Sequence, residues 1–167
     1  MCTAVRFSSE EGSPFLGRNL DWSCGYGEKV RIMPKDFMVP WAFKESTPAR
    51  HAVIGMCVEF QNYPLFFDCG NDAGLAVASL NHPGCAEYAP NPAEGKTNIA
   101  AYEFPTWVAA NYETVDEVEA ALADSLIIEK SFNEHFPVSY LHWIIGDATR
   151  SIVVESRADG LHVFDNP

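Results

Sequence analysis

The first seven residues, MCTAVRF (residues 1–7), place a cysteine directly behind the initiator methionine and at the head of a short β-rich run. The modest size of the Cys2 side chain should allow removal of Met1, after which one residue carries both a thiol and a free α-amine. An amine that can take a proton, close to a sulfur that can attack, is a nucleophile with its own base. The simpler interpretation is a chance cysteine at a frayed terminus. The surrounding sequence decides between these two interpretations.

A hairpin is predicted to follow this terminus. The segment SSEEGSP is a cluster of turn formers, so residues 3–7 should pair antiparallel with residues 15–20. This pairing brings Arg18 or Asp21 near Cys2. An arginine beside a thiol favours the thiolate, and an aspartate beside an α-ammonium can orient it and shuttle its proton. The alternative is a surface Arg–Asp pair without a chemical role.

The remaining pattern is strands, then two helices, then strands. One helix is predicted over residues 103–112, with Pro105 acceptable only in its first turn. The next helix begins with a capping box, in which Thr114 is the N-cap and Glu117 reaches back to the amide of Thr114. This order favours a single α+β layered domain over residues 1–167 rather than alternating βαβ units. Further strands are predicted at residues 28–33, 51–60, 64–68, 74–80, 141–145, 151–156 and 161–164.

Charge and composition exclude several classes of function. The chain has 167 residues, with 23 Asp and Glu against 11 Lys and Arg, and a formal charge of −12. Such a chain is not attracted to phosphate backbones or anionic membranes. It contains neither a signal-peptide pattern nor an apolar run of the roughly 18 residues that a membrane span requires. Five irregularly spaced cysteines do not resemble a disulfide framework, so a reduced, cytoplasmic protein is expected.

A second chemistry-bearing segment is LNHPG at residues 80–84. An asparagine at the end of a strand, here Asn81, can donate its side-chain amide to a developing oxyanion. More often such an asparagine caps a turn. Metal binding is the competing use of this region, but the spacings among its cysteines and His82 match no common zinc motif. We therefore expect neither a metal centre nor a cofactor.

Together, several motifs resemble the choloylglycine hydrolases, the bile salt hydrolase and penicillin V acylase family of N-terminal-nucleophile amidases. The motifs occur in the family's order and cover essentially the whole chain. Any one of them would be weak, but the set is highly specific. They are MCT at residues 1–3, GRNLDW at 17–22, NDAGLA at 71–76, LNHPG at 80–84, EGKTN at 94–98, LHW at 141–143 and SIVVE at 151–155.

The resemblance implies an αββα sandwich with Cys2 at the end of an inner strand. In this family the Cys2 thiol attacks an amide carbonyl, its α-amine relays the proton, and water hydrolyses the S-acyl enzyme. Arg18 and Asp21 match residues that hold the nucleophile and its amine, and Asn81 matches an oxyanion-hole contributor. The resemblance also suggests a homotetramer for the full-length protein.

The substrate implied is a bile acid conjugated with glycine or taurine. Asn81 favours bile salts, because penicillin V acylases tend to carry a tyrosine at that position. The apolar steroid would need a pocket, for which the expected walls are Trp22, Tyr26, Phe60 and Phe132.

Two departures from the family pattern bear on this expectation. His82 stands where similar sequences usually carry an aromatic residue such as phenylalanine. Family members also continue well past Pro167, and that part contains a further oxyanion-hole asparagine and a second active-site arginine. The expected sandwich is therefore incomplete, and residues 1–167 are expected to be inactive alone. The alternatives are a penicillin V or other N-acyl amide hydrolase, and an inactive fragment or non-catalytic binding module.

Overall fold

A seven-stranded sheet forms the centre of the computed structural model, which describes residues 2–21, 23 and 25–167. Each neighbouring pair of strands is antiparallel. The NDAGLA segment forms the predicted tight connection between two of them, where Gly74 takes a φ of 94° that favours glycine. Across the sheet the order is β13 (Gly160–Asp165), β12 (Ser151–Arg157), β11 (Leu141–Gly146), β8 (Ala76–Asn81), β7 (Tyr63–Asn71), β6 (Val53–Phe60) and β3 (Lys29–Met33).

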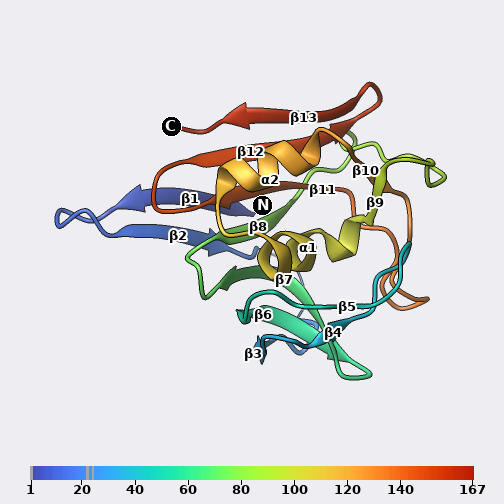
Figure 1. The fold of residues 1–167 in the computed structure, drawn as a ribbon, viewed down its shortest axis with the longest axis horizontal. Helices are drawn as coiled ribbons and strands as arrows, with labels where there is room; N and C mark the ends of the chain where they lie inside the picture. The colour runs from blue at the N-terminus through green and yellow to red at the C-terminus, as the bar shows by residue number, and fades with distance from the viewer. Residues whose placement is uncertain (1, 22, 24) are drawn as a thin grey trace.

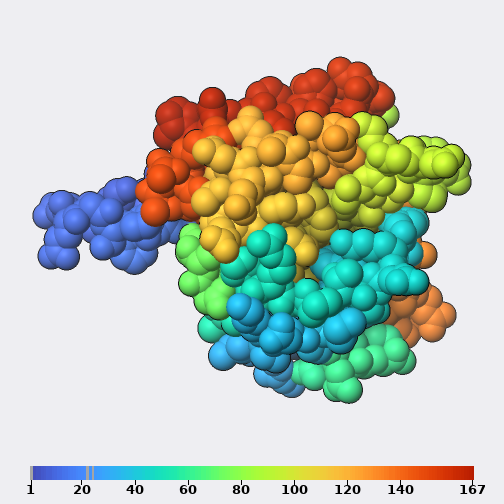
Figure 2. Space-filling model, viewed as in Figure 1, coloured from blue at the N-terminus to red at the C-terminus, as the bar shows by residue number. Residues whose placement is uncertain are grey.

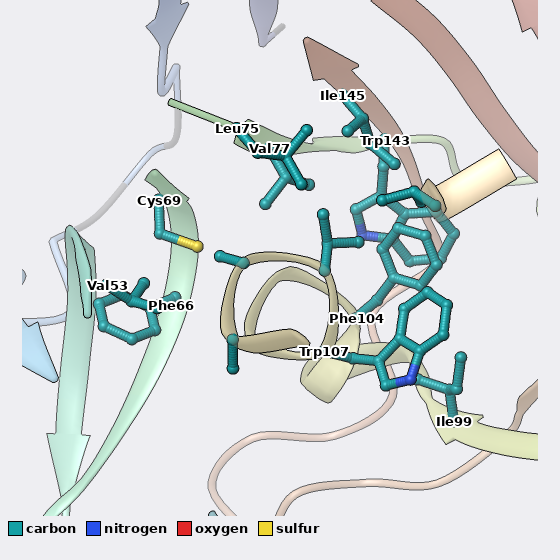
Figure 3. Close-up of a cluster of buried hydrophobic side chains, with 14 of the residues drawn as sticks. Val53, Phe66, Cys69, Leu75, Val77, Ile99, Phe104, Trp107, Trp143 and Ile145 are labelled. Atoms are coloured by element: carbon teal, nitrogen blue, oxygen red, sulfur yellow. The ribbon is translucent and has the colours of Figure 1, made fainter. Parts of the chain in front are cut away.

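Helices cover one face of this sheet (Figure 1). A 3₁₀ turn, η1 (Ala101–Glu103), leads into α1 (Phe104–Asn111), and α1 packs against β7 and β8. The rings of Phe104 and Trp143 lie 4.2 Å apart between their centroids (Figure 3). The second helix, α2 (Val115–Leu122), adds its buried apolar stripe to the same core. Burial of these side chains supplies the main driving force for docking the helices on the sheet.

The N-terminal hairpin lies on the opposite face of the sheet. Its strands β1 (Thr3–Ser8) and β2 (Pro14–Asn19) pair in the predicted antiparallel way. Since Ile145 belongs to the core under the helices, the alternation of a strand turns Gly146 to the other face. A Cβ on Gly146 would lie only 3.2 Å from Leu16 of the hairpin. The hairpin is thus the first pair of strands of a second layer.

Apolar side chains of this hairpin remain exposed. The hairpin tip extends beyond the body of the molecule (Figure 2). Val5, Phe7 and Phe15 are each about half exposed, and the rings of Phe7 and Phe15 stack on each other. Residues 2–21, 23 and 25–167 therefore include a helical layer, the seven-stranded sheet and, in the hairpin, the beginning of a second sheet layer. This arrangement agrees with the predicted α+β class and with an incomplete sandwich.

Several local predictions can be compared with the structure. The Thr114 hydroxyl accepts from the Glu117 amide, as predicted for the N-cap of α2. The other half of the capping box is wrong, because the Glu117 carboxylate accepts from the amide of Glu113. The extended backbone at Thr114 brings that preceding amide within reach. The sequence prediction missed two short pairs, parallel β9 (Thr97–Ala100) with β10 (Ser125–Ile128), and antiparallel β4 (Met38–Val39) with β5 (Thr47–Pro48).

Among the described residues, the helices are all too short or too polar to cross a bilayer.

Candidate active site

Arg18 and Cys2 meet at one end of the N-terminal hairpin. Arg18 pairs with Ala4 across the hairpin, and Cys2 is on the same face as Ala4 because side chains alternate along a strand. One guanidinium nitrogen of Arg18 lies 3.9 Å from the Cys2 Sγ. The predicted proximity of these two side chains is therefore confirmed.

The guanidinium of Arg18 is held by the central sheet. Its Nη1 lies 3.2 Å from the Asp68 carboxylate on β7, and its Nη2 donates to the Ser79 carbonyl of β8 at 3.0 Å. The Arg18 side chain is only 7% exposed. A buried cation with two oxygen partners in fixed positions is a rigid charge beside the sulfur. Arg18 thus joins the hairpin to the sheet and presents a positive charge to Cys2.

Asp68 is a site residue that the sequence interpretation missed. Burial raises the pKa of the Asp68 carboxyl above its ordinary value, although the positive charge of Arg18 opposes this rise. A partly buried carboxylate in the apolar run PLFFDCG is costly unless it is paired, and here Arg18 is the partner. An acidic residue inside an apolar strand was the signal available in the sequence. Its partner lies 50 residues away and could not be read from local spacing.

Asp21 and Asn81 complete the set of predicted polar residues. A hydrogen bond to the amino terminus of the chain lowers the pKa of the Asp21 carboxyl, and the positive charge of that terminus lowers it further. Asn81 ends β8, two residues after Ser79, so the two side chains are on the same face of the strand. Cys2, Arg18, Ser79 and Asn81 all line one cavity.

This cavity has a volume of about 430 Å³ and a largely apolar wall. Its polar end is formed by Cys2, Arg18 and Asn81, and Lys130 and His135 add cationic or polar groups elsewhere on the wall. The volume suits a small organic molecule. Such a lining fits a mostly apolar body that carries a negatively charged group. The apolar wall consists mainly of Leu20, Tyr26, Leu65, Phe66, Phe67, Tyr102, Phe132, Phe136, Pro137, Val138, Tyr140 and Leu141.

Aromatic contacts hold the loop between β10 and β11 against this cavity. The Phe132 ring stacks on Tyr63 at 5.6 Å and meets Tyr102 edge-on at 5.1 Å. Phe136 of the same loop lies 6.1 Å from Tyr26. Pairs of this kind favour a fixed arrangement of the rings. The wall of the cavity is therefore assembled from segments far apart in the sequence.

The predicted pocket walls have different positions in the structure. Tyr26 and Phe132 line the cavity that contains Cys2. Phe60 instead lines a neighbouring pocket of about 390 Å³, where it meets Phe132 edge-on at 5.8 Å. Trp22 lies outside the described residues. Phe60 thus contacts Phe132, which lines both pockets, but does not itself line the cavity of Cys2.

Known proteins are similar to this chain in both sequence and fold. The chain is 48% identical over 98% of its length to a bile salt hydrolase/transferase of Bifidobacterium longum subsp. longum, and covers 51% of that protein. Two crystal structures of the conjugated bile acid hydrolase from Clostridium perfringens superpose closely on it. The C2A variant has a TM-score of 0.94 at 38% identity, and the R18L variant 0.93 at 36%.

Each of these structures covers 99% of this chain, whereas the chain covers 51% of each of them. The chain therefore spans about half the length of the relatives it matches. The likeness confirms the predicted fold class, since the strands and helices follow those of the bile acid hydrolases. Residues 2–167 match the family described as linear amide C–N hydrolases, choloylglycine hydrolase family, and the chain belongs to that family.

Proposed function

We propose that the protein is a cysteine amidase that hydrolyses the amide bond of bile acids conjugated with glycine or taurine. The observation that carries the proposal is the position of Cys2. Its Sγ lies beside the buried Arg18 guanidinium, at the polar end of an apolar cavity. A nucleophile in that position can reach an amide carbonyl while an apolar body occupies the rest of the cavity.

The reaction requires two steps at Cys2. The sulfur attacks the amide carbonyl carbon, a C–S bond forms, and the C–N bond breaks after the leaving nitrogen has received a proton from the Cys2 amine. Water then attacks the S-acyl carbon, which releases the free acid and restores the thiol. The free α-amine acts as base and acid in turn, so this mechanism uses no histidine.

Three neighbouring residues would support these steps. Arg18 stabilises negative charge on the sulfur, and Asp68 fixes the position of Arg18. Asp21, two residues after the end of β2, would orient the Cys2 amine once Met1 is removed. The Asn81 amide, at the edge of the same cavity, donates to the carbonyl oxygen as negative charge develops there.

The shape and charge of the cavity support a conjugated bile salt as substrate. A steroid is a rigid apolar body, and the aromatic wall around Phe132 and Tyr102 can cover it. The glycine or taurine end carries a negative charge, for which Arg18 and Lys130 are the cationic groups among the cavity residues.

The test is a substrate panel on the complete gene product that carries residues 1–167. Release of taurine from taurocholate is measured beside release of phenoxyacetate from penicillin V, with Cys2→Ala as the matched control. We expect taurocholate to be cleaved with the larger kcat/KM and the Cys2→Ala variant to release neither product. A larger kcat/KM for penicillin V would assign the protein to the acylases. Activity that persists in Cys2→Ala would overturn the mechanism.

Residues 1–167 by themselves are expected to hydrolyse taurocholate far more slowly than a complete relative does. They span 51% of the Bifidobacterium relative, and several apolar side chains of their N-terminal hairpin are exposed. The experiment compares taurine release by this chain with release by that relative at equal concentration. Comparable turnover would contradict this expectation. The homotetramer stays a prediction, to be checked by light scattering on the complete gene product.

A further inference from the structure

A cluster of two histidines and one glutamate lies next to the candidate active site. His82 directly follows Asn81 at the end of β8, His142 is on β11, and Glu155 is on β12. His142 and Glu155 are direct partners across the two strands. One potential ligand atom from each of the three residues lies within 4.8 Å of the others. Among the residues that line the Cys2 cavity, none belongs to this cluster.

The three side chains lie close together, with the two histidine rings stacked. The His82 and His142 rings stack with centroids 4.4 Å apart. The His142 Nδ1 is buried, forms no hydrogen bond with any described residue, and lies 3.9 Å from Glu155 Oε1. A buried ring nitrogen normally has a hydrogen-bond partner or a metal. The His142 Nδ1, which has no hydrogen-bond partner among the described residues, is therefore an independent sign that a ligand binds between these residues.

Glu155 presents one oxygen to the cluster. Arg157 donates to Oε2 through Nε at 2.8 Å, while Oε1 is the oxygen that faces His142. Arg157 places a positive charge near the cluster, but that charge is already paired with the second carboxylate oxygen.

The three side chains belong to residue types that bind transition-metal ions. A neutral imidazole has a free lone pair, whereas an imidazolium has none. Two imidazole nitrogens and a carboxylate oxygen are a common ligand set for Zn²⁺ and related ions.

We propose that His82, His142 and Glu155 form a binding site for a divalent transition-metal ion such as Zn²⁺, separate from the Cys2 cavity. Ligand atoms of a tetrahedral ion lie about 3.4 Å apart, given bonds of about 2.1 Å. The atoms here therefore need to approach by about an ångström. Rotation of the His82 and His142 side chains would have to supply that movement, because the His82 amide donates to the Tyr140 carbonyl and the His82 carbonyl accepts from Cys85 and Ala86.

Sequence spacing gave no indication of this site. The metal ligands considered from the sequence were His82 and nearby cysteines, but Cys57 and Cys69 are buried in the core beneath the helices. The other ligands come from β11 and β12, about 60 and 70 residues further along the chain, and strand pairing alone brings them together. Binding of an ion would join the turn that follows Asn81 to both strands.

The test uses Co²⁺ as a spectroscopic probe of the untagged chain. Visible d–d absorption reports on Co²⁺ bound by nitrogen and oxygen, and a thiolate ligand would add a strong near-ultraviolet band. Titrations compare the unaltered chain with His82→Phe, His142→Gln and Glu155→Gln. His135→Gln is the matched control, because His135 is an exposed histidine outside the cluster. Circular dichroism verifies that each variant is folded, and His82→Phe is the variant least able to disturb the sheet.

We expect one equivalent of Co²⁺ to bind without a thiolate band. Each change of a ligand residue should weaken binding at least tenfold, since even residues that only support metal ligands contribute tenfold or more. His135→Gln should bind within twofold of the unaltered chain. Absence of saturable binding below millimolar Co²⁺ would overturn the proposal. Binding that survives both His82→Phe and His142→Gln, or that shows a thiolate band, would overturn it equally.

Discussion

The buried carboxyl of Glu103 should make the stability of this protein depend on pH. Glu103 is 1% exposed and ends η1, directly after the cavity residue Tyr102. Its two oxygens accept from the amides of Ala42 at 2.5 Å and Ala100 at 3.2 Å. Burial raises the pKa of Glu103 to about 7, although these hydrogen bonds oppose the rise. The perturbation is Glu103→Gln, combined with a change of pH.

The magnitude follows from proton linkage. Between pH 4.5 and pH 7 the folded protein holds this proton more tightly than the unfolded chain, whose carboxyl titrates at the ordinary value of 4.5. Stability therefore falls as the pH rises through this window. A shift of this size corresponds to about 3 kcal/mol in total, of which about 2 kcal/mol develops between pH 5.5 and pH 8.

The glutamine variant removes this titration but offers one carbonyl oxygen to two buried amides. An unsatisfied buried donor costs about 1–3 kcal/mol at every pH. Glu103→Gln should accordingly be less stable than the unaltered chain at pH 5.5, and the difference should shift by about 2 kcal/mol in its favour at pH 8. Urea unfolding at both pH values measures this shift. Glu45→Gln, at an exposed position, is the control. A difference that stays constant within about 1 kcal/mol, or shifts in the opposite direction, would refute the reasoning.

Three further predictions concern the site and the fold around it. Arg18→Leu should keep the fold, as the R18L variant of the Clostridium relative does. The rate of alkylation of Cys2 should fall about tenfold at pH 7, while the rate at Cys85 stays the same. Phe132→Ala should weaken taurocholate binding at least tenfold in calorimetry, while Phe60→Ala, at the neighbouring pocket, changes it less than threefold. Asp147→Asn should reduce stability by about 1 kcal/mol in urea at pH 7. Burial raises the pKa of Asp147, but the hydrogen bond from Val115 outweighs this and lowers it to about 2. The stability that the Asp147 carboxylate contributes is therefore lost as the pH falls from 3.8 through 2. The Asp147→Asn variant should not show this loss.

The local parts of this structure could be predicted from sequence because their signals are local. Turn formers between two short apolar runs predicted the N-terminal hairpin, which was expected to bring Arg18 or Asp21 near Cys2, and the observed register places Arg18 opposite Ala4. The Thr114 cap and the short connection at Gly74 have equally local signals. The motifs of the family resemblance supplied the layered architecture.

Contacts between distant segments could not be predicted in this way. Asp68 was missed because its partner Arg18 reaches it across two layers. Phe60 was placed at the substrate cavity on its aromatic character alone, but it lines the neighbouring pocket, where it contacts Phe132. The pairing of β9 with β10 was missed because the two short runs are separated by both helices. Such contacts depend on how the layers of the fold pack on one another, and the hydrophobic periodicity of a single segment does not indicate which distant segments will meet.

The rate of alkylation at each cysteine tests the central claim most directly. After removal of Met1, the chain is treated with iodoacetamide at pH 7, and the modified peptides are quantified over time. Cys2 should react fastest because its own amine and Arg18 activate the sulfur, and taurocholate should slow its reaction by filling the cavity. If Cys2 reacted no faster than the exposed Cys85 and taurocholate gave no protection, Cys2 would not be the nucleophile of a bile salt amidase.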